Sequence, residues 1–569
     1  MKLKHNILAI SAACLCGFSL VSCSDMLEIE SLNEIVLENF WNEKSDVDNV
    51  VAGCYSALQS QSCIDRMMVW GECRSENMIG GTRISDDVNL ENIFKENIKA
   101  TNGYTTWVSF YSVINRCNTV LKYAPSVSEK DPKYTQSELH ATQAEMSALR
   151  DLCYFYLIRT FRDVPYTKEA FVDDSQVMAL PATKFNDVLD SLINDLENVK
   201  DYAIKTYPTS KPEYQHGRIT RDAISAMLCD MYLWKGNYNK CIEYADKVIN
   251  SKKEEYKEKQ ENGYVTSTSL INGFPLISDS YSSASNYYGQ ASTAIFGTGN
   301  SDESIFELIY EDNDNMLANS AVSSRYGNAT YIQGYFAPSD LVSAEHDYPN
   351  SRNDVFEKND IRPLENVNSV FGSSAYCISK YASSRTNVTL TASTASTSTS
   401  LYPKNYCHAN WIIYRLSDVM LMKAEAMTQL LSDDNNQESD MRPIFNIINA
   451  VNKRSYASNE MGDTLKYNTY ASKSLLENLV FDERNRELMF EGKRWYDLVR
   501  RSLRDGNTTY LVDRVLRKGS SESSVVSSKL SSLDAIFWPY NYDEMKANGN
   551  LVQNPAFSSG TNDSYTTTK

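Results

Sequence analysis

The sequence predicts a mainly α-helical fold, in which a scaffold of helical hairpins carries a loop-rich, irregular portion. Three observations support this. Apolar residues recur with a 3.6-residue period in several segments, as in residues 185–199. These segments follow one another in pairs across short turns. Long stretches rich in Ser, Tyr, Gly and Asn separate the pairs, and the chain of 569 residues has ordinary globular composition, 42% hydrophobic and 23% charged.

The predicted helices can be placed in chain order from their apolar faces. They cover residues 107–121, 146–161, 185–199, 223–234, 238–249, 411–431, 444–453 and 475–501. The segments 223–234 and 238–249 meet at the turn Gly236-Asn237 and carry small Ala residues at close-approach positions, so they resemble a tetratricopeptide hairpin. Successive hairpins would bury faces against their neighbours and build a solenoid-like scaffold.

The irregular stretches are predicted at residues 262–300, 326–372 and 386–400. The Ser/Thr run Thr386–Ser400 reads as a flexible excursion. Loops of this length in a compact protein are usually functional or disordered, and the tyrosines between residues 281 and 336 favour function there.

The N-terminus predicts export. Lys2 and Lys4 precede an apolar run from Ile7 to Leu20, which is too short to span a membrane but suits a signal peptide. The run ends Leu20-Val21-Ser22-Cys23, which resembles a bacterial lipobox with Cys23 as the lipidated residue. Residues 1–22 would then be a lipoprotein signal peptide; the alternative is an ordinary signal peptide with a chance cysteine.

Residues 23–38 are predicted to form a lipidated acidic tether. Ser24-Asp25-Met26-Leu27-Glu28-Ile29-Glu30 resembles the export signal of surface lipoproteins in the Bacteroidetes. The lipid would hold the protein at the outer membrane, with the chain exposed at the cell surface.

The charge and the cysteines exclude several classes of protein. The net charge is −17, which argues against a nucleic-acid partner because phosphate binding needs clustered Lys and Arg. Of the 12 cysteines, nine remain after Cys14, Cys16 and Cys23, and no CxxC pair is among them. An odd count without such pairs predicts buried thiols, as at Cys153, Cys229 and Cys241, rather than disulfides or a zinc site.

Catalytic and cofactor motifs are missing from the sequence. The four histidines after the signal peptide form no HExxH, and no GxSxG, Walker or GxGxxG pattern occurs, so no catalytic residue, metal site or cofactor is predicted. A glycosidase needs only two opposed carboxylates, and the sequence singles out no pair. Asp312-Asn313-Asp314-Asn315 begins like a calcium loop but lacks its Gly and closing Glu, so a solvated turn is favoured over calcium.

Several segments resemble the SusD/RagB-like family of outer-membrane nutrient-binding lipoproteins. The segment 481–500, FDERNRELMFEGKRWYDLVR, is similar to the family signature ER..EL.fEG.R..DL.R. Further segments that resemble family elements lie at residues 52–55, 159–161, 303–307, 411–427, 448–454, 537–539 and 550–555, with Trp107 and Asn118 also fitting. The resemblance implies one SusD-like globule over residues 39–569, with an N-terminal part at about 39–250 and a loop-rich C-terminal part at about 251–569.

Most of these motif residues are expected to be structural. Glu483, Arg484, Glu487, Glu491, Arg494 and Asp497 recur at i, i+3 and i+4 and predict intrahelical ion pairs. Asp418 and Glu425 are expected to support the fold, and Trp107 and Trp495 to lie in the core.

The resemblance also implies a function. SusD-like proteins bind a glycan at the cell surface and act as the lid of a SusC-like TonB-dependent transporter, without catalysis. The helical repeats would dock on the transporter, and aromatic rings of the loop-rich face would stack on sugar rings. Two alternatives stay open: the same fold binding a peptide or other non-glycan nutrient in a pocket lined by charges, or a surface glycoside hydrolase.

Candidate ligand-binding residues are taken from loops that hold an aromatic or polar side chain. They are Trp70, Glu76, Asn77, Arg83, Tyr287, Tyr288 and Tyr331. Glu76-Asn77 stands where the family often carries an Asp in a ligand-facing loop, and Tyr287-Tyr288 and Tyr331 lie in the long loops. For each of them, core packing or an inert surface position is the alternative.

Overall fold

The computed structural model describes residues 40–173, 175–264, 266–279, 287–311, 317–342, 355–356, 360–369, 375–390, 395–403, 407–433, 435–456, 465–519 and 523–560. The predicted signal peptide, Cys23, the tether and the acidic turn at residues 312–315 lie outside these ranges. Among the helices in the described ranges, none is long and apolar enough to cross a membrane.

Helices dominate the described chain, as the apolar periodicity predicts. In the N-terminal half they are α3 (Lys44–Leu58), α4 (Gln61–Glu72), α5 (Val88–Phe94), α6 (Val108–Lys130), α7 (Gln136–Phe161), α8 (Phe185–Val199), α9 (Tyr214–Gly217), α10 (Arg221–Lys235) and α11 (Tyr238–Glu261). Later in the chain they are α12 (Gln290–Ser292), α13 (Ser320–Arg325), α14 (Arg362–Asn366), α15 (Leu416–Gln429), α16 (Glu438–Arg454), α17 (Lys473–Leu488), α18 (Arg494–Asp505), α19 (Thr509–Leu516), α20 (Ser523–Lys529) and α21 (Tyr542–Ala547).

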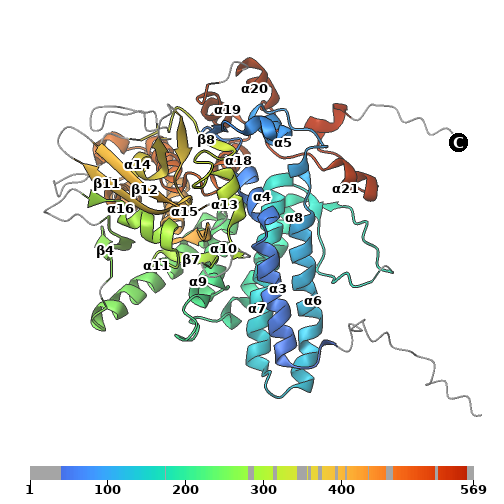
Figure 1. Cartoon of the computed structure of the whole chain (residues 1–569). Helices are drawn as coiled ribbons and strands as arrows, with labels where there is room; N and C mark the ends of the chain where they lie inside the picture. The colour runs from blue at the N-terminus through green and yellow to red at the C-terminus, as the bar shows by residue number, and fades with distance from the viewer. Residues whose placement is uncertain are drawn as a thin grey trace, which may run out of the picture.

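The helices pack as hairpins. The long helices α3, α6 and α7 stand side by side and project from the rest of the molecule (Figure 1). Helix α7 begins at a capping box, in which the Thr135 side chain accepts from Glu138 N–H and Glu138 accepts from the Thr135 backbone. Helices α10 and α11 form the predicted hairpin, and Gly236 ends α10 at φ +75°, a conformation that glycine adopts without strain.

Three local predictions are wrong in their boundaries or type. Residues 411–431 are a strand followed by α15, and residues 475–501 are interrupted between α17 and α18. The described residues of the Ser/Thr run, 386–390 and 395–400, belong to two paired antiparallel strands rather than to a flexible excursion. The strand at residues 411–415 forms by pairing with residues 304–308, which periodicity along the chain does not report.

The strands are short and lie in small sheets. They are β1 (Met78–Gly80), β2 (Val164–Pro165), β3 (Ala182–Thr183), β4 (Thr268–Ile271), β5 (Phe274–Ile277), β6 (Tyr287–Tyr288), β7 (Ser304–Leu308), β8 (Phe336–Pro338), β9 (Val367–Ser369), β10 (Tyr376–Ile378), β11 (Ser383–Leu390), β12 (Ala395–Leu401) and β13 (Trp411–Arg415). Three pairings join distant segments: β1 with β8, β6 with β11 and β7 with β13, all antiparallel.

One large apolar core joins both halves of the chain. Its buried residues run from Trp41 to Leu551 and include Trp107, as predicted. A second cluster fills the space between α15, α16 and α17, and a third, which contains Trp495, lies around α18, α19 and α20. Burial of these faces is the main force that holds the hairpins together.

Candidate functional site

The pairing of β1 with β8 brings two loops together at the surface. Met78 faces Pro338 and Gly80 faces Phe336, so the turn after β1 lies beside the segment that leads into β8. A Cβ on Gly81 would lie 2.5 Å from the Gly334 carbonyl oxygen. The two loops therefore approach as closely as they do because glycine occupies this position.

Arg83 and two tyrosines form the centre of this surface, which we call the tyrosine–arginine platform (Arg83, Tyr331 and Tyr335). The guanidinium carbon of Arg83 lies 4.3 Å from the centroid of the Tyr331 ring and 4.7 Å from that of Tyr335. Its Nη2 also donates to the Tyr335 hydroxyl at 3.2 Å. These contacts fix the rings around one cation.

A buried ion pair supports the platform from beneath. The guanidinium of Arg325, on α13, lies 5.1 Å from the Tyr335 centroid. Arg325 is held in turn by Asp65 of α4, to which its Nε and Nη2 donate at 2.9 and 2.8 Å. Because this bidentate pair is buried and well aligned, it positions Tyr335 firmly.

Polar groups border the rings. The Thr82 N–H donates to Gln333 Oε1, and Gln333 Nε2 donates to the Tyr376 carbonyl, both at 2.6 Å. Tyr331 is 43% exposed. An exposed ring bordered by amide, hydroxyl and guanidinium groups can stack on an apolar face while the border exchanges hydrogen bonds with hydroxyls.

Trp70, Glu76 and Asn77 lie in the interior, so the structure gives them a supporting place instead of the predicted ligand-facing one. Trp70 Nε1 donates to the Tyr104 carbonyl at 2.8 Å, and Glu76 pairs with Arg494 at 2.5 Å. Asn77 Nδ2 donates to Glu72 and to Asn485, both at 2.8 Å. All three are 2% exposed or less.

Trp70, Glu76 and Asn77 lie in the interior because α4 closely approaches the turn before α18. A Cβ on Gly71 would lie 1.8 Å from the Gly492 carbonyl oxygen, so the two backbones touch and leave no room for a ligand. The residues after Gly71 instead anchor β1: Ser339 Oγ donates to the Glu76 carbonyl at 2.7 Å, and Ser339 N–H donates to the Asn77 carbonyl at 2.9 Å. They position the platform without belonging to its surface.

The tyrosine pair at residues 287–288 forms β6. Both residues pair with β11, Tyr287 with Thr389 and Tyr288 with Val388. The Tyr288 ring is 7% exposed and packs in a small cluster with Ile361 and Val388. Tyr288 is therefore a core residue here, whereas the side chain of Tyr287 lies outside the described part of the structure.

The acids of the C-terminal signature are buried and paired with cations. Glu487 accepts from Arg415 at 2.5 Å and from Arg362 at 3.2 Å, and Glu491 accepts from Arg415 at 2.6 Å. Burial opposes ionisation of Glu487, but the surrounding guanidinium groups hold its pKa well below the ordinary range. The structural role predicted for these residues is confirmed, but most of their partners are on other elements rather than on the same helix.

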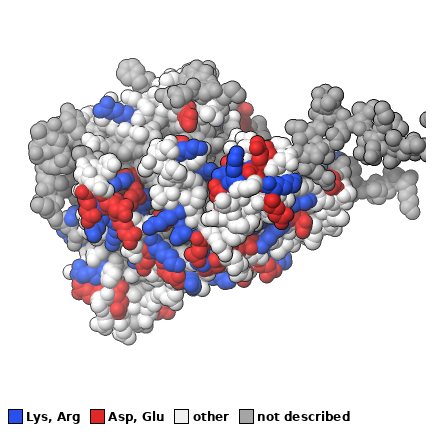
Figure 2. Space-filling model, turned by 90° about the horizontal axis from the view of Figure 1, so that it is seen from below, with Lys and Arg blue, Asp and Glu red and all other residues white. Residues whose placement is uncertain are grey.

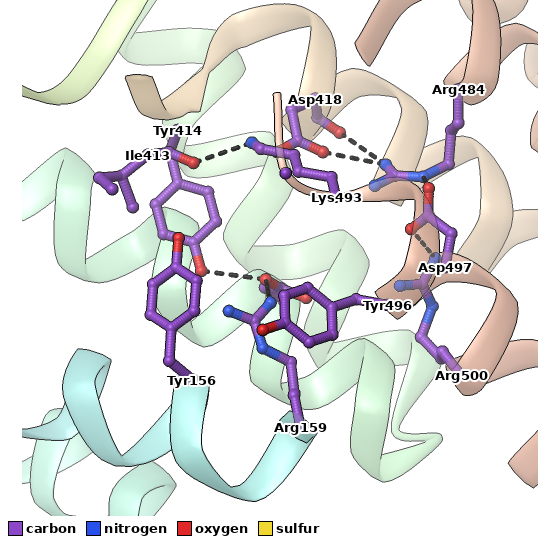
Figure 3. A pocket seen from close by; sticks show the side chains of 12 residues that line it. Tyr156, Arg159, Ile413, Tyr414, Asp418, Arg484, Lys493, Tyr496, Asp497 and Arg500 are labelled. Carbon is purple, nitrogen blue, oxygen red and sulfur yellow. Dashed lines mark hydrogen bonds and ion pairs between the residues drawn. The ribbon is translucent and has the colours of Figure 1, made fainter. Parts of the chain in front are cut away.

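Figure 3 shows a small polar pocket that is lined by residues of α7, α10, β13, α15, α17 and α18. Asp418 faces Arg484, at 3.0 Å, and Lys493, whose ammonium group also donates to the Ile413 carbonyl at 2.8 Å. Burial opposes the charge on Asp418, yet Lys493 and Arg484 lower its pKa to about 2. A carboxylate held ionised by two cations is suited to joining helices and is poorly suited to general acid catalysis.

Asp230 of α10 also lines this pocket and contacts residues of two other elements. Tyr414 Oη donates to Asp230 at 3.0 Å, and Arg159 contacts the same carboxylate at 3.4 Å. Burial raises the pKa of Asp230 in spite of Arg159. These contacts join the end of α7 to α10 and β13.

A metal ion requires several donor side chains, such as His, Cys, Asp and Glu, at one place in the structure. No group of three or more His, Cys, Asp or Glu in the described ranges has an arrangement that could hold a metal ion. The nine cysteines in the described chain are buried, among them Cys153, Cys229 and Cys241 as predicted. On the face seen in Figure 2, acidic and basic side chains are interspersed, so neither sign of charge dominates that face.

These features define a protein built on helical repeats with a solvent-facing tyrosine–arginine surface. Two family models match the chain in succession: one described as the SusD family over residues 231–557, and one described as starch-binding associating with outer membrane over residues 25–233. The chain belongs to the SusD family.

Relatives of known name match along nearly the whole chain. SusD-like protein P38 of Formosa agariphila is 25% identical over 557 residues, which cover 94% of this chain and 95% of the relative. SusD-like protein P25 of the same organism is 23% identical over 505 residues, covering 85% and 88% of the two chains.

Solved structures share the fold. A SusD superfamily protein from Bacteroides thetaiotaomicron VPI-5482 superposes with a TM-score of 0.63 at 18% identity, covering 90% of this chain and 100% of that chain. A structure described as a laminarin binding SusD-like protein gives a TM-score of 0.56 at 17% identity, with the same coverage. The predicted mainly α, SusD-like fold is confirmed.

Proposed function

We propose that the protein is a cell-surface lipoprotein that captures a glycan and passes it to a SusC-like TonB-dependent transporter, without catalysis or a cofactor. The observation that carries the proposal is the tyrosine–arginine platform, with Tyr331 exposed and held by Arg83 at 4.3 Å. Such a ring offers a flat apolar face at low entropic cost because its orientation is already fixed.

Binding would combine stacking with hydrogen bonding. The Tyr331 ring would stack on the C–H face of a sugar, while Arg83 and Gln333 at the border would bond its hydroxyls. Each contact is weak, but a polymer presents many copies of the same unit at high local concentration. Of the residues predicted from the sequence, Arg83 and Tyr331 remain the proposed ligand residues.

Membership of the family supports the proposed location and partner. A lipid on Cys23 would hold the protein on the outer membrane, facing outward, and the hairpins of α3, α6 and α7 would be available to dock on the transporter. Association with the transporter would keep captured glycan close to the import channel. A pull-down with a lipidated, tagged form from solubilised outer membranes tests this partner.

The primary experiment is binding of the mature domain, without Cys23, to a panel of plant, microbial and host polysaccharides. Laminarin belongs in the panel because one structure of the same fold is described as binding it. Retardation by one glycan class, weakened by Tyr331→Ala and without new reducing ends, supports glycan capture. New reducing ends would favour the glycoside hydrolase. Binding of a peptide, with no binding of any polysaccharide in the panel, would favour the non-glycan alternative.

A further inference from the structure

A second pocket lies away from the tyrosine–arginine platform, between α3, α7 and α9. Its volume is about 490 Å³, which is within the range of small-ligand sites. One wall is a single stripe of α3 and its C-cap residue, formed by Lys44, Asp48, Ala52, Tyr55 and Gln59, which recur every three or four residues. None of its lining residues belongs to the platform.

Two cations that line this pocket are already paired with carboxylates of the protein. Arg218 donates to both oxygens of Glu145, at 2.7 and 2.6 Å. Lys44 pairs with Glu138 at 2.6 Å. Because each pair has no net charge, the remaining ionisable residues determine the net charge of the pocket.

The remaining charge is negative. Asp48, Glu213 and Glu311 line the pocket together with one further cation, Lys211. Within the described residues, neither Asp48 nor Glu213 forms an ion pair. A pocket with unmatched carboxylates attracts a cation more strongly than a neutral or anionic ligand of the same shape.

Tyrosine rings supply the second element of a cation site. The Arg218 guanidinium lies 5.2 Å from the Tyr214 centroid and 5.8 Å from that of Tyr55, and the Lys211 ammonium lies 4.6 Å from Tyr214. The rings of this pocket therefore already hold the protein's own cations, by the attraction between positive charge and an aromatic face.

A third element is a buried hydroxyl at the pocket wall. Tyr134 is 1% exposed, and its hydroxyl, near Thr142, has no hydrogen-bond partner of ordinary geometry among the described residues. Burial raises the pKa of Tyr134 to about 12, so the hydroxyl stays protonated at neutral pH. A buried polar group without a partner gains most from a ligand that supplies one.

We propose that this pocket binds a small organic cation: a primary ammonium group on a short apolar stem. The ammonium would lie between Asp48, Glu213 and the Tyr134 hydroxyl, and the stem would lie against Ala52 and Ile204. The same chemistry is offered by a free alkylamine and by a lysine side chain of a peptide, so the test separates these two sources.

The test titrates the mature protein at low salt with three probes: n-pentylamine, 1-pentanol as the neutral equivalent, and N-acetyl-lysine methylamide. Binding is followed by calorimetry and NMR into the millimolar range. The Asp48→Asn/Glu213→Gln double variant removes the charge but keeps the shape, Tyr134→Phe removes only the hydroxyl, and Glu258→Gln, on the exposed part of α11, is the matched control.

We expect pentylamine to bind at least about tenfold more tightly than pentanol, and the double variant to lose about that factor while Glu258→Gln loses none. Binding of the lysine probe as well would assign the ligand to a peptide side chain, and binding of pentylamine alone would assign it to a free amine. Equal binding of amine and alcohol, no binding of either amine probe, or binding unaffected by the pocket variants would each overturn the proposal. Glycan binding at the platform should be unchanged in every variant, so the two sites are tested separately.

Discussion

The guanidinium carbon of Arg83 lies 4.3 Å from the centroid of the Tyr331 ring, although the two residues are far apart in the sequence. The same guanidinium lies over Tyr335, which a second arginine, Arg325, contacts at 5.1 Å. This alternation of rings and cations fixes an exposed ring before any ligand arrives, which lowers the entropic cost of binding.

Tyr331→Ala should weaken binding of the glycan identified in the polysaccharide panel by about 5- to 30-fold, because it removes the stacking face. Tyr331→Phe should retain most of the affinity, since the ring remains. Affinity electrophoresis measures both. Tyr264→Ala, which removes another exposed ring at the end of α11, is the control; an equal loss in this control would rule out a specific role for Tyr331.

Gly71→Ala should destabilise the fold by about 3 kcal/mol, because the new Cβ would lie 1.8 Å from the Gly492 carbonyl oxygen. Gly53→Ala is the matched variant in α3: its Cβ meets Arg116 Nη1 only at 3.8 Å, so helix propensity should stabilise by about 0.5–1 kcal/mol. Urea unfolding of both variants checks the contrast. If Gly71→Ala is as harmless as Gly53→Ala, α4 does not approach the turn before α18 as closely as described.

Arg415→Gln should cost about 3–5 kcal/mol of unfolding free energy, because it leaves the buried carboxylates of Glu487 and Glu491 without their shared cation. Arg442→Gln breaks an exposed pair with Glu438 on α16 and should cost less than about 0.5 kcal/mol. Chemical unfolding compares the two arginine variants. A small loss at Arg415 would contradict the tight interior packing of the signature acids.

Glu365→Gln should flatten the dependence of stability on pH. Burial, together with the charge of Asp279, raises the pKa of Glu365 well above its ordinary value of 4.5. The folded state therefore binds this proton more tightly than the unfolded state, so the wild-type protein loses stability as pH rises from 4.5 toward the raised pKa. The Glu365→Gln variant cannot bind this proton, so it lacks this loss of stability with rising pH.

The expected difference in slope is up to about 1.4 kcal/mol per pH unit, measured as the unfolding free energy of both proteins between about pH 4.5 and about pH 8. Glu129→Gln, on the exposed end of α6, should leave the wild-type slope unchanged. Parallel curves for wild type and Glu365→Gln would show that this carboxyl is not held protonated by the fold.

Cys23→Ala should release the protein from the membrane fraction, because the lipid on Cys23 is the proposed anchor. Fractionation of cells that express wild type or variant, followed by immunoblotting, measures the shift. A variant that stays with the outer membrane would overturn the anchoring proposal and favour an ordinary signal peptide.

Local patterns in the sequence were enough to predict the helical scaffold. Helix α8 occupies residues 185–199 as its apolar period indicates, and the turn at Gly236 separates α10 from α11. Such elements follow from the spacing of apolar residues and from the permissive backbone of glycine, which act over a few residues. The family motifs added the order of these elements and the expected class of function.

The sequence alone determined that the chain is a helical-hairpin protein of this family with tyrosines in its loops, whereas the tertiary structure decided which of them reach solvent. Trp70, Glu76 and Asn77 became interior because Gly71 touches Gly492. Arg83 contacts Tyr331 because β1 pairs with β8, and the same pairing places it over Tyr335, which the sequence did not predict as a site residue. These contacts join residues far apart in the chain, and their energy depends on packing between elements that no local pattern encodes.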